Sequence, residues 1–261
     1  MHVFGPAARY PLAPRRAYTP PDASIEELLA LQQRLGLERL VVVHPSVYGT
    51  DNSCTLDALK RVGRRARGVA VIDGETSSNE LLEMKRLGVR GVRVNLQTGG
   101  VHDPATARRL LEEAAARAAP LGWHVQVFTT MAVLKAIAVE KLPVPLVIDH
   151  FGLPRDEDDC EYLASLLRRG NVWVKLSATH RLPMDPGPVV RALIAANPER
   201  CVWGSDWPHA TTGPRDPGRV QPLDPIDDAA ALERLRGWVA DGALFRKILV
   251  DNPARLYDFP R

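Results

Sequence analysis

The chain has 261 residues, with 34 Lys and Arg against 31 Asp and Glu, and therefore a formal net charge of +3. About 250 residues is the usual length of a (β/α)₈ barrel. The composition, with 45% hydrophobic and 25% charged residues, excludes long disorder. The three cysteines are far apart without a CxxC pair, which excludes a disulfide framework and the usual zinc knuckles. No apolar run approaches ~18 residues and no leader pattern opens the chain. We therefore expect a soluble, cytoplasmic protein that contacts no membrane.

Arginine greatly outnumbers lysine, with 28 Arg and only six Lys. A genome rich in G and C explains most of such an excess. The alternative is that some arginines bind carboxylates, because the planar guanidinium matches that group. The one dense basic run, RVGRRARG at 61–68, stands among interspersed acidic residues, so no nucleic-acid surface is expected.

Short apolar runs alternate with longer helical patterns along the whole chain. Strands are predicted at 39–46, 68–73, 88–96, 123–130, 145–150, 171–177 and 200–209. Near-continuous apolar strands between helices indicate a parallel sheet covered by helices. Seven strands fit an open doubly wound sheet, but a closed barrel needs eight. No glycine-rich nucleotide motif follows a strand, and no linker interrupts the composition, so a single domain over 1–261 is predicted.

Local signals mark the helix boundaries between these strands. Ser24 with Glu27, and Ser77 with Glu80, have the spacing of a capping box, and Pro104 follows Asp103 at a predicted first helical position. Glycines fall between helix and strand where a left-handed residue is needed, at Gly36, Gly88, Gly122 and Gly170.

Polar residues follow the apolar runs, where a (β/α)₈ enzyme carries its chemistry. They are Ser46, Arg93, Asn95, Asp149, His150, Lys175, Ser177, Asp206 and His209. Side chains alternate between the two faces of a strand, and this period of two places Arg93 and Asn95 on the face that points into the barrel. An inward arginine needs either an anionic ligand or an ion pair with an acid.

The terminal run WGSDWPHA predicts that Asp206 and His209 hold a water and accept its proton, with a helix-capping Asp206 as the alternative. The alternation of side chains along a strand places His150 on the same face as Leu146 and Ile148. The alternative is that His150 is a buried core histidine. Of the other histidines, His124 begins a strand and is expected to be structural, and His180 to be a loop residue. The roles of His44 and His102 stay open.

The motifs HVFGPAARYPL, VHPSVYGTDNS, GVRGVRVNL, IDHFG, VKLS, WGSDWPH and DNPARLYDF occur in order over nearly the whole chain. In them the sequence resembles the amidohydrolase-related lactonases, a family that includes dicarboxylate lactonases, sugar-acid lactonases and a lactone isomerase. The resemblance implies an amidohydrolase-type (β/α)₈ barrel, with the first strand truncated at Met1. It implies a hydrolase that opens a carboxylated or polyhydroxylated lactone.

The resemblance also implies roles for individual residues. Asp206 would be the general base that activates water, and His2 and His150 would donate hydrogen bonds to the lactone carbonyl oxygen. Arg93 would hold a substrate carboxylate. The remaining substrate-binding residues implied are Tyr18, Ser46, Asn95, Arg181 and His209.

Two departures from the family pattern change these expectations. The position two residues before His2 lies ahead of Met1, so the His-x-His pair is incomplete. We therefore expect no cofactor; a zinc ion, if bound, would use His2, His150 and Asp206. The loop after Asn95 has no arginine, and Leu153 stands where the dicarboxylate lactonases have one. Poor hydrolysis of 2-pyrone-4,6-dicarboxylate is therefore expected.

Three alternatives to a metal-free lactonase remain. One is a lactone isomerase that uses the same base without net addition of water. Another is a metal-dependent amidohydrolase, if an upstream segment restores the His-x-His pair. The third is a weakly catalytic binding protein with exposed strand edges. The long Pro- and Gly-rich loops 5–23 and 207–226 either form a lid carrying Tyr18 and His209 or are disordered. A small-molecule substrate and a possible homo-oligomer complete the expectations.

Overall fold

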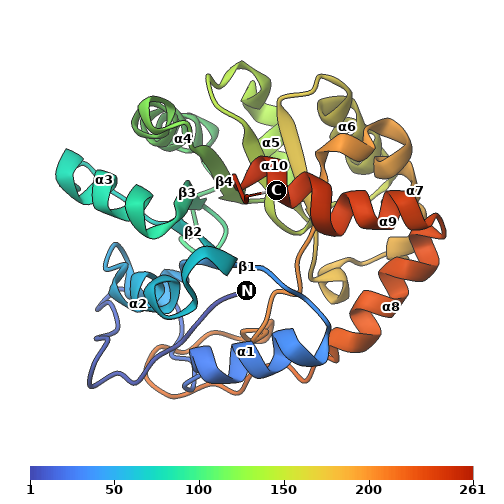
Figure 1. Ribbon diagram of the computed structural model, residues 1–261. Coiled ribbons are helices and arrows are strands. Elements are labelled where there is room, and N and C mark those ends of the chain that lie inside the picture. Colours follow the sequence, from blue (N-terminus) through green and yellow to red (C-terminus); the bar gives the residue numbers. More distant parts are fainter. Residues whose placement is uncertain (261) are drawn as a thin grey trace. The chain divides into compact units, whose positions relative to one another are not determined.

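Each of the seven predicted apolar runs overlaps a parallel strand in the computed structural model, which describes residues 1–260. The strands are β1 (Leu40–Val43), β2 (Ala66–Ala70), β3 (Val89–Asn95), β4 (His124–Phe128), β5 (Leu146–Ile148), β6 (Val172–Leu176) and β7 (Cys201–Trp203). The chain, whose elements are labelled in Figure 1, divides into two compact units. The first comprises Met1–Arg93 and Asp206–Ala229, and the second Val94–Ser205 and Ala230–Arg261. The single domain over 1–261 stays a prediction.

In the first unit, β1, β2 and β3 pair in chain order, with Val42 opposite Gly68. The helices are α1 (Ile25–Arg34), α2 (Ser53–Val62) and α3 (Ser78–Leu87). Helix α2 packs on β1 and β2. A Cβ at Gly68 would come within 2.6 Å of the Leu59 side chain, so the glycine permits this close packing of α2 on the sheet.

In the second unit, β4 to β7 pair in chain order, with Leu146 opposite Val125 and Val172. Around them lie α4 (Pro104–Ala118), α5 (Met131–Ala136), α6 (Glu157–Arg168), α7 (Pro186–Ala196), α9 (Gly242–Arg246) and α10 (Asn252–Leu256). Helix α8 (Asp228–Val239) begins in the first unit and continues into the second. Helices α6 and α7 lie side by side (Figure 1). The strand interior is fully buried at Leu146, Ile148, Val172 and Val174, so it supplies the core of this unit.

Short turns join these elements. The 3₁₀ turns are η1 (Ser46–Tyr48), η2 (Gly63–Arg65), η3 (Ala119–Leu121), η4 (Val139–Lys141), η5 (Asp149–Gly152), η6 (Thr179–Arg181) and η7 (Pro198–Arg200), and η8 (Lys247–Asp251) is a π turn. The turn η5 corrects one sequence prediction. Period-two parity was wrong as a guide to His150, because the chain leaves the strand at Asp149 and His150 is left-handed.

The predicted helix boundaries are confirmed. Ser24 and Ser77 both form capping boxes with the glutamate three residues later, and the Asp103 side chain accepts a hydrogen bond from Thr106 N at 2.8 Å. The four glycines have positive φ angles between +67° and +105°. A residue with a Cβ would be strained there, which explains glycine at these helix ends.

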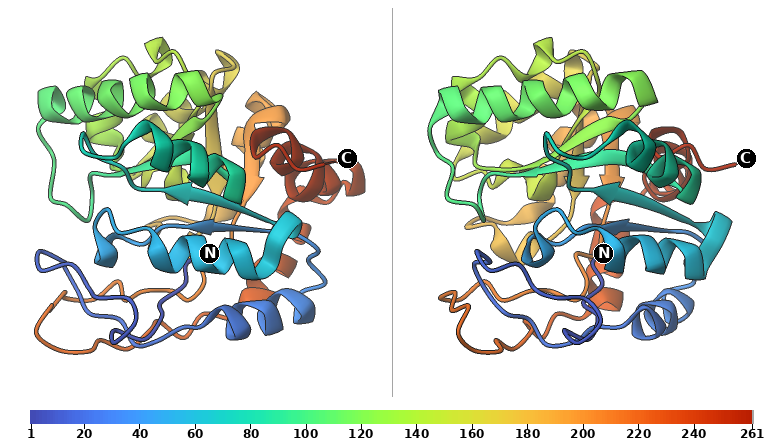
Figure 2. Two further views of the ribbon diagram at one scale, coloured as in Figure 1. Left: turned by 60° about the vertical axis from the view of Figure 1, so that its left-hand side comes forward. Right: turned by 90° about the vertical axis from the view of Figure 1, so that its left-hand side faces the viewer.

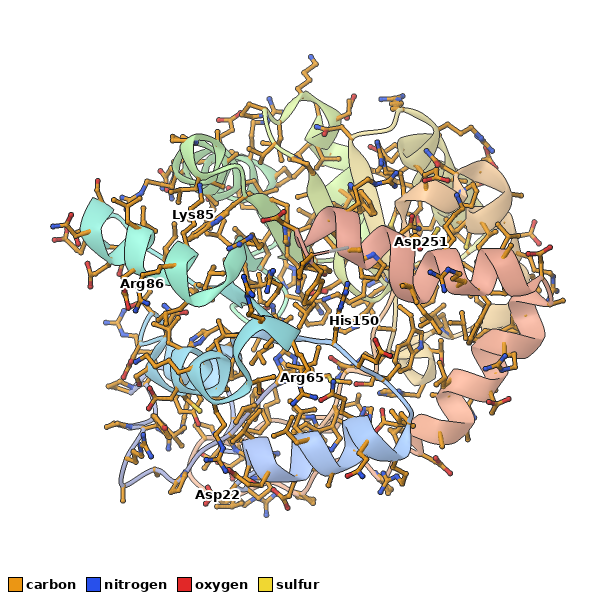
Figure 3. The ribbon with its side chains drawn as sticks, in the orientation of Figure 1. Asp22, Arg65, Lys85, Arg86, His150 and Asp251 are labelled. Carbon is orange, nitrogen blue, oxygen red and sulfur yellow. The ribbon has the colours of Figure 1, made fainter. Side chains whose placement is uncertain are left out.

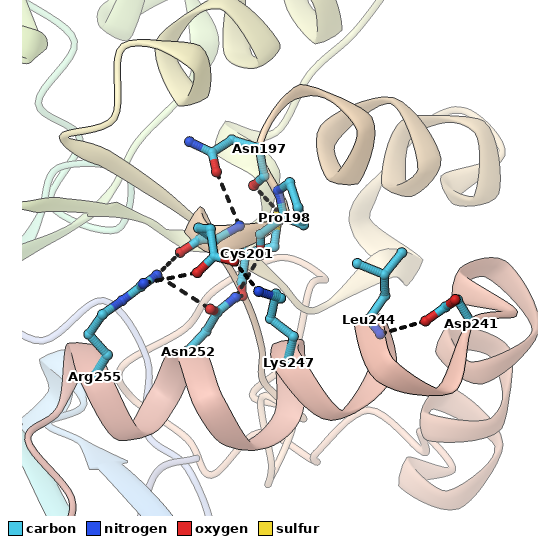
Figure 4. A network of polar contacts seen from close by, with 9 residues as sticks. Asn197, Pro198, Cys201, Asp241, Leu244, Lys247, Asn252 and Arg255 are labelled. Atoms are coloured by element: carbon cyan, nitrogen blue, oxygen red, sulfur yellow. Dashed lines mark hydrogen bonds and ion pairs between the residues drawn. The ribbon is translucent and has the colours of Figure 1, made fainter.

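A group of polar contacts centred on Asn252 attaches the C-terminal helices to the start of β7 (Figure 4). The buried Asn252 side chain donates to the carbonyl oxygens of Pro198 and Cys201, both at 2.7 Å. Beside it, Lys247 and Arg255 both form ion pairs with Glu199. These contacts hold the start of β7 against the last turns of the described chain.

Candidate active site

Strained backbone conformations follow the ends of β5, β6 and β7. Non-glycine residues with positive φ occur at His150 (51°), Ala178 (53°), Asp206 (69°) and His209 (66°). Left-handed conformations are unfavourable for residues with a Cβ and persist where the surroundings enforce them, commonly at functional sites. Three of these four residues are the predicted His150, Asp206 and His209.

The first unit brings His2 and Asp206 together. His2 Nε2 lies 3.5 Å from Asp206 Oδ1, and the His2 amide donates to the Trp207 carbonyl at 2.7 Å. Burial lowers the pKa of the His2 imidazole below its usual value; the Asp206 contact opposes this and the Arg93 charge adds to it. Asp206 is also buried, with 8% of its surface exposed.

Arg93, Tyr18 and Ser46 belong to the same group of residues. The buried Arg93 donates from Nη1 to the His44 carbonyl at 3.3 Å, and its charge acts on both His2 and Tyr18. The Tyr18 hydroxyl is hydrogen-bonded to Ser46. Its pKa is raised by burial, so it stays protonated although Arg93 favours its ionisation. We call His2, Tyr18, Ser46, Arg93 and Asp206 the Asp206 cluster; all five were predicted site residues.

His209 has a partner that the sequence did not indicate. Its Nε2 lies 3.1 Å from Asp228 Oδ1, and both side chains are only 4% exposed. Since a carboxylate accepts, the His209 Nε2–H donates to it. Asp228 begins α8, nineteen residues after His209. Nothing at that spacing in the sequence predicts the pair.

In the second unit, His150 lies in the turn η5 that follows β5, and it is labelled in Figure 3. Its Nδ1 lies 2.8 Å from Ser177 Oγ, and its ring meets the Phe128 ring edge to face at 5.0 Å. The preceding Asp149 accepts hydrogen bonds from Lys175 at 2.7 Å and Gln126 at 3.0 Å. This buried charge network fixes the turn that carries His150.

The other predicted site residues of the second unit, Asn95 and Arg181, have local structural contacts. Asn95 Oδ1 accepts a hydrogen bond from Thr98 N at 2.9 Å and stabilises the turn after β3. Arg181 is half-buried at the end of η6, where its amide donates to the Ala178 carbonyl at 3.0 Å. Substrate binding by these two residues stays a prediction.

The loops 5–23 and 207–226 are joined to each other (Figure 2). Thr19 pairs with Val220 in a bridge, and Thr19 O accepts from Gln221 N at 2.8 Å. The Arg16 and Thr19 side chains both donate to Pro217 O. Both loops thus have defined backbone partners, and through them the segment that contains Arg215 lies beside Tyr18, 6.0 Å from its ring centre. No pattern in the sequence indicated Arg215.

The remaining histidines divide into buried and exposed. His44 is fully buried between Thr55 Oγ1 and the Gly49 carbonyl, each at 3.0 Å, so its role is structural. His124 begins β4 and packs edge-on against Tyr257, and the structural role expected for it stays a prediction. His102 and His180 are exposed.

A zinc ion bound here would need several ligand-type side chains grouped together. Within residues 1–260, no three His, Cys, Asp or Glu side chains are grouped as ligands. Of the ligand-type side chains in the Asp206 cluster, only His2 and Asp206 approach each other, whereas a catalytic zinc takes three from the protein. Across the same residues, no helix is both long enough and apolar enough to cross a membrane.

Comparison with known proteins defines the class. The amidohydrolase family matches residues 1–259. The chain is 38% identical to 4-sulfomuconolactone hydrolase of Rhizobium radiobacter and 36% identical to 2-pyrone-4,6-dicarboxylate hydrolase of Comamonas testosteroni, each over 98% of this chain and 88% of the relative. It is 29% identical to D-galactarolactone isomerase of Agrobacterium fabrum, over 98% of this chain and 89% of the relative.

Solved structures of similar proteins agree with this family assignment. A Pseudomonas putida protein described as a 2-pyrone-4,6-dicarboxylic acid hydrolase is 32% identical, with a TM-score of 0.80 over 100% of this chain and 96% of its own. A Bordetella bronchiseptica protein described as a TIM-barrel protein has a TM-score of 0.64 at 16% identity, over 90% of this chain and 83% of its own, which concerns the fold alone. The fold is thus the amidohydrolase-type barrel. The chain belongs to the amidohydrolase family, among relatives named as hydrolases of lactones.

Proposed function

We propose that this protein hydrolyses a lactone that carries an anionic group. The observation that supports the proposal most is the buried Arg93 in the Asp206 cluster, because a buried guanidinium beside a carboxylate and a histidine suits an anionic substrate. The relatives named for sulfomuconolactone and pyrone dicarboxylate act on lactones of that kind.

The proposed chemistry uses Asp206 as the general base. Its carboxylate takes a proton from water, and the water oxygen bonds to the lactone carbonyl carbon. His150 donates a hydrogen bond to the carbonyl oxygen as this oxygen gains negative charge. The ring C–O bond then breaks, and Asp206 returns its proton to the leaving ring oxygen. Arg93 holds the anionic substituent, and the Tyr18 and Ser46 hydroxyls are available to orient the ring.

The experiment is a pH-stat assay on lactones that bear a carboxylate, a sulfonate or no charge. Hydrolysis releases acid, and charged lactones are expected to give the higher kcat/KM. Asp206→Asn should lower kcat by about 10²-fold or more, whereas His102→Gln, an exposed histidine, should leave it unchanged. Full activity of Asp206→Asn would place the base elsewhere.

Lactone isomerisation is the second candidate, since one relative is named as an isomerase. The same base would then move a proton or the ring closure without net addition of water. Chromatography of the products distinguishes the two reactions, because isomerisation consumes no alkali in the pH-stat. A product of unchanged mass would favour the isomerase.

Three expectations accompany the proposal. Turnover of 2-pyrone-4,6-dicarboxylate should be slow, because the loop after Asn95 and position 153 have no arginine. Treatment with a chelator should leave activity intact, in keeping with the two-residue donor set. The cytoplasmic location and a possible homo-oligomer stay predictions.

A further inference from the structure

The loop 207–226 brings a second guanidinium group to the Asp206 cluster. Arg215 Cζ lies 6.0 Å from the centre of the Tyr18 ring, and the Tyr18 hydroxyl is hydrogen-bonded to Ser46 within the cluster. Burial raises the pKa of the Tyr18 phenol, and the charges of Arg93 and Arg215 both oppose that rise. The charges of the two guanidinium groups therefore act on the same side chain.

The two arginines differ in their exposure to solvent. The Arg93 side chain is buried, whereas Arg215 is exposed. An anion that binds Arg93 must give up its water, while an anion at Arg215 keeps part of its hydration. The two residues thus offer one enclosed and one solvent-accessible position for negative charge.

The backbone on both sides of Arg215 is held in place. The buried Gln221 side chain donates to the Pro214 carbonyl oxygen and accepts a hydrogen bond from Asp216 N at 2.9 Å. The Pro217 carbonyl oxygen accepts hydrogen bonds from two side chains of the other loop. The fold therefore fixes where the Arg215 side chain begins, so that a contact from it to a ligand requires little ordering of the loop.

The charges that act on Tyr18 favour a ligand with more than one negative charge. Two of them are guanidinium groups and one is the Asp206 carboxylate. A site with an excess of positive charge attracts a dianion more strongly than a monoanion. We propose that Arg215 is a specificity-determining residue that binds a second carboxylate or sulfonate on a lactone whose first anionic group is held by Arg93. This rests on the proposed function, from which the lactone and its contact with Arg93 are taken.

The kinetic test compares two lactones with the same ring, one with a single carboxylate and one with two. The wild-type enzyme should have the lower KM for the dicarboxylate. Arg215→Gln should raise that KM about tenfold, the equivalent of one solvent-exposed charge-assisted hydrogen bond. The kcat and the KM of the monocarboxylate should change little, and Arg215→Lys, which keeps the charge, should recover part of the loss. An unchanged KM for the dicarboxylate in Arg215→Gln would overturn the proposal.

Arg219→Gln is the matched control for this test. Arg219 is exposed on the same loop, and its Nε lies 3.2 Å from Asp216 Oδ2. Its replacement should leave both KM values unchanged, and an equal loss there would assign the effect to the overall charge of the loop and overturn the proposal. If Arg215 only held its loop against Tyr18, Arg215→Gln would impair both lactones equally and lower the melting temperature, which would also overturn it.

A binding measurement needs no turnover and is therefore independent of the proposed function. The probes are isophthalate and benzoate, which carry two carboxylates and one on the same ring, titrated into the enzyme by calorimetry. The wild type should bind isophthalate more tightly, and Arg215→Gln should remove most of the difference. This result without turnover of any lactone would contradict the proposed hydrolysis and support the role of Arg215 in binding. A wild type that binds isophthalate no more tightly than benzoate would overturn that role.

Discussion

Arg93 is a permanent charge kept away from water, and its side chain is only 7% exposed. A buried charge is costly to desolvate, and an anionic substrate group that binds to it offsets part of that cost. Arg93→Gln should raise KM for carboxylated lactones about 10²-fold, corresponding to about 2.7 kcal/mol. The KM of a neutral lactone serves as the internal control and should change little. An equal loss on both substrates would mean that Arg93 supports the fold instead.

Ser177 is expected to position His150 through the Nδ1 contact at 2.8 Å. If the hydroxyl donates to Nδ1, Nε2 carries the hydrogen that the carbonyl oxygen needs. Ser177→Ala should lower kcat about tenfold with little change in KM, and Ser177→Thr should restore it. A melting temperature equal to that of the wild type would show that the lower kcat does not come from unfolding. If kcat of Ser177→Thr does not recover, the positioning role of Ser177 is contradicted.

At the residue scale the sequence predicted side-chain direction only where the strand was regular. Arg93 lies within β3, so the period of two placed it correctly. His150 lies two residues beyond a strand of three residues, in a left-handed turn that no propensity favours. Asp228 lies at the start of a helix and Arg215 lies in a loop. The partners of residues at such positions depend on tertiary contacts.

Asn252 joins two elements through a single side chain. Its amide donates to two carbonyl oxygens before and at the start of β7. Asn252→Ala leaves buried carbonyls unsatisfied and should reduce the free energy of unfolding by about 2–4 kcal/mol. Urea denaturation measures the loss. The matched control is Asn79→Ala, at an exposed position of α3, which should change stability by less than about 0.5 kcal/mol.

Helix boundaries were the most predictable elements because their signals are local. A capping box or a glycine at a helix end is satisfied within a few residues, so Ser24, Ser77 and Gly88 could be recognised without the fold. Strand ends were less predictable. The predicted run 200–209 extends to His209, yet the strand ends at Trp203.

Across the molecule, burial of neutral histidine links stability to pH. Burial lowers the pKa of His44 from 6.5 to about 3; the Gly49 hydrogen bond and Asp51 oppose this, and the Arg93 and His2 charges add to it. The unfolded chain therefore binds a proton below pH 6.5 that the folded chain does not. Stability is full above pH 6.5 and falls by up to about 1.4 kcal/mol per pH unit toward pH 3.

Urea denaturation at pH 7 and pH 5 measures this dependence. The wild type should lose free energy of unfolding between these values, and His44→Gln, which cannot gain the proton, should lose less. The variant will be less stable at pH 7, so the comparison is of the differences between the two pH values. Identical differences in both proteins would assign the pH dependence to other groups.

The hydrogen bonds between loops 5–23 and 207–226 have a consequence for engineering. Each loop supplies backbone partners to the other, and one carries Tyr18 while the other carries His209. Neither segment is therefore an independent module. A transplant of one loop from a relative would remove one partner of the Thr19–Gln221 hydrogen bond, so a chimera should exchange both segments together.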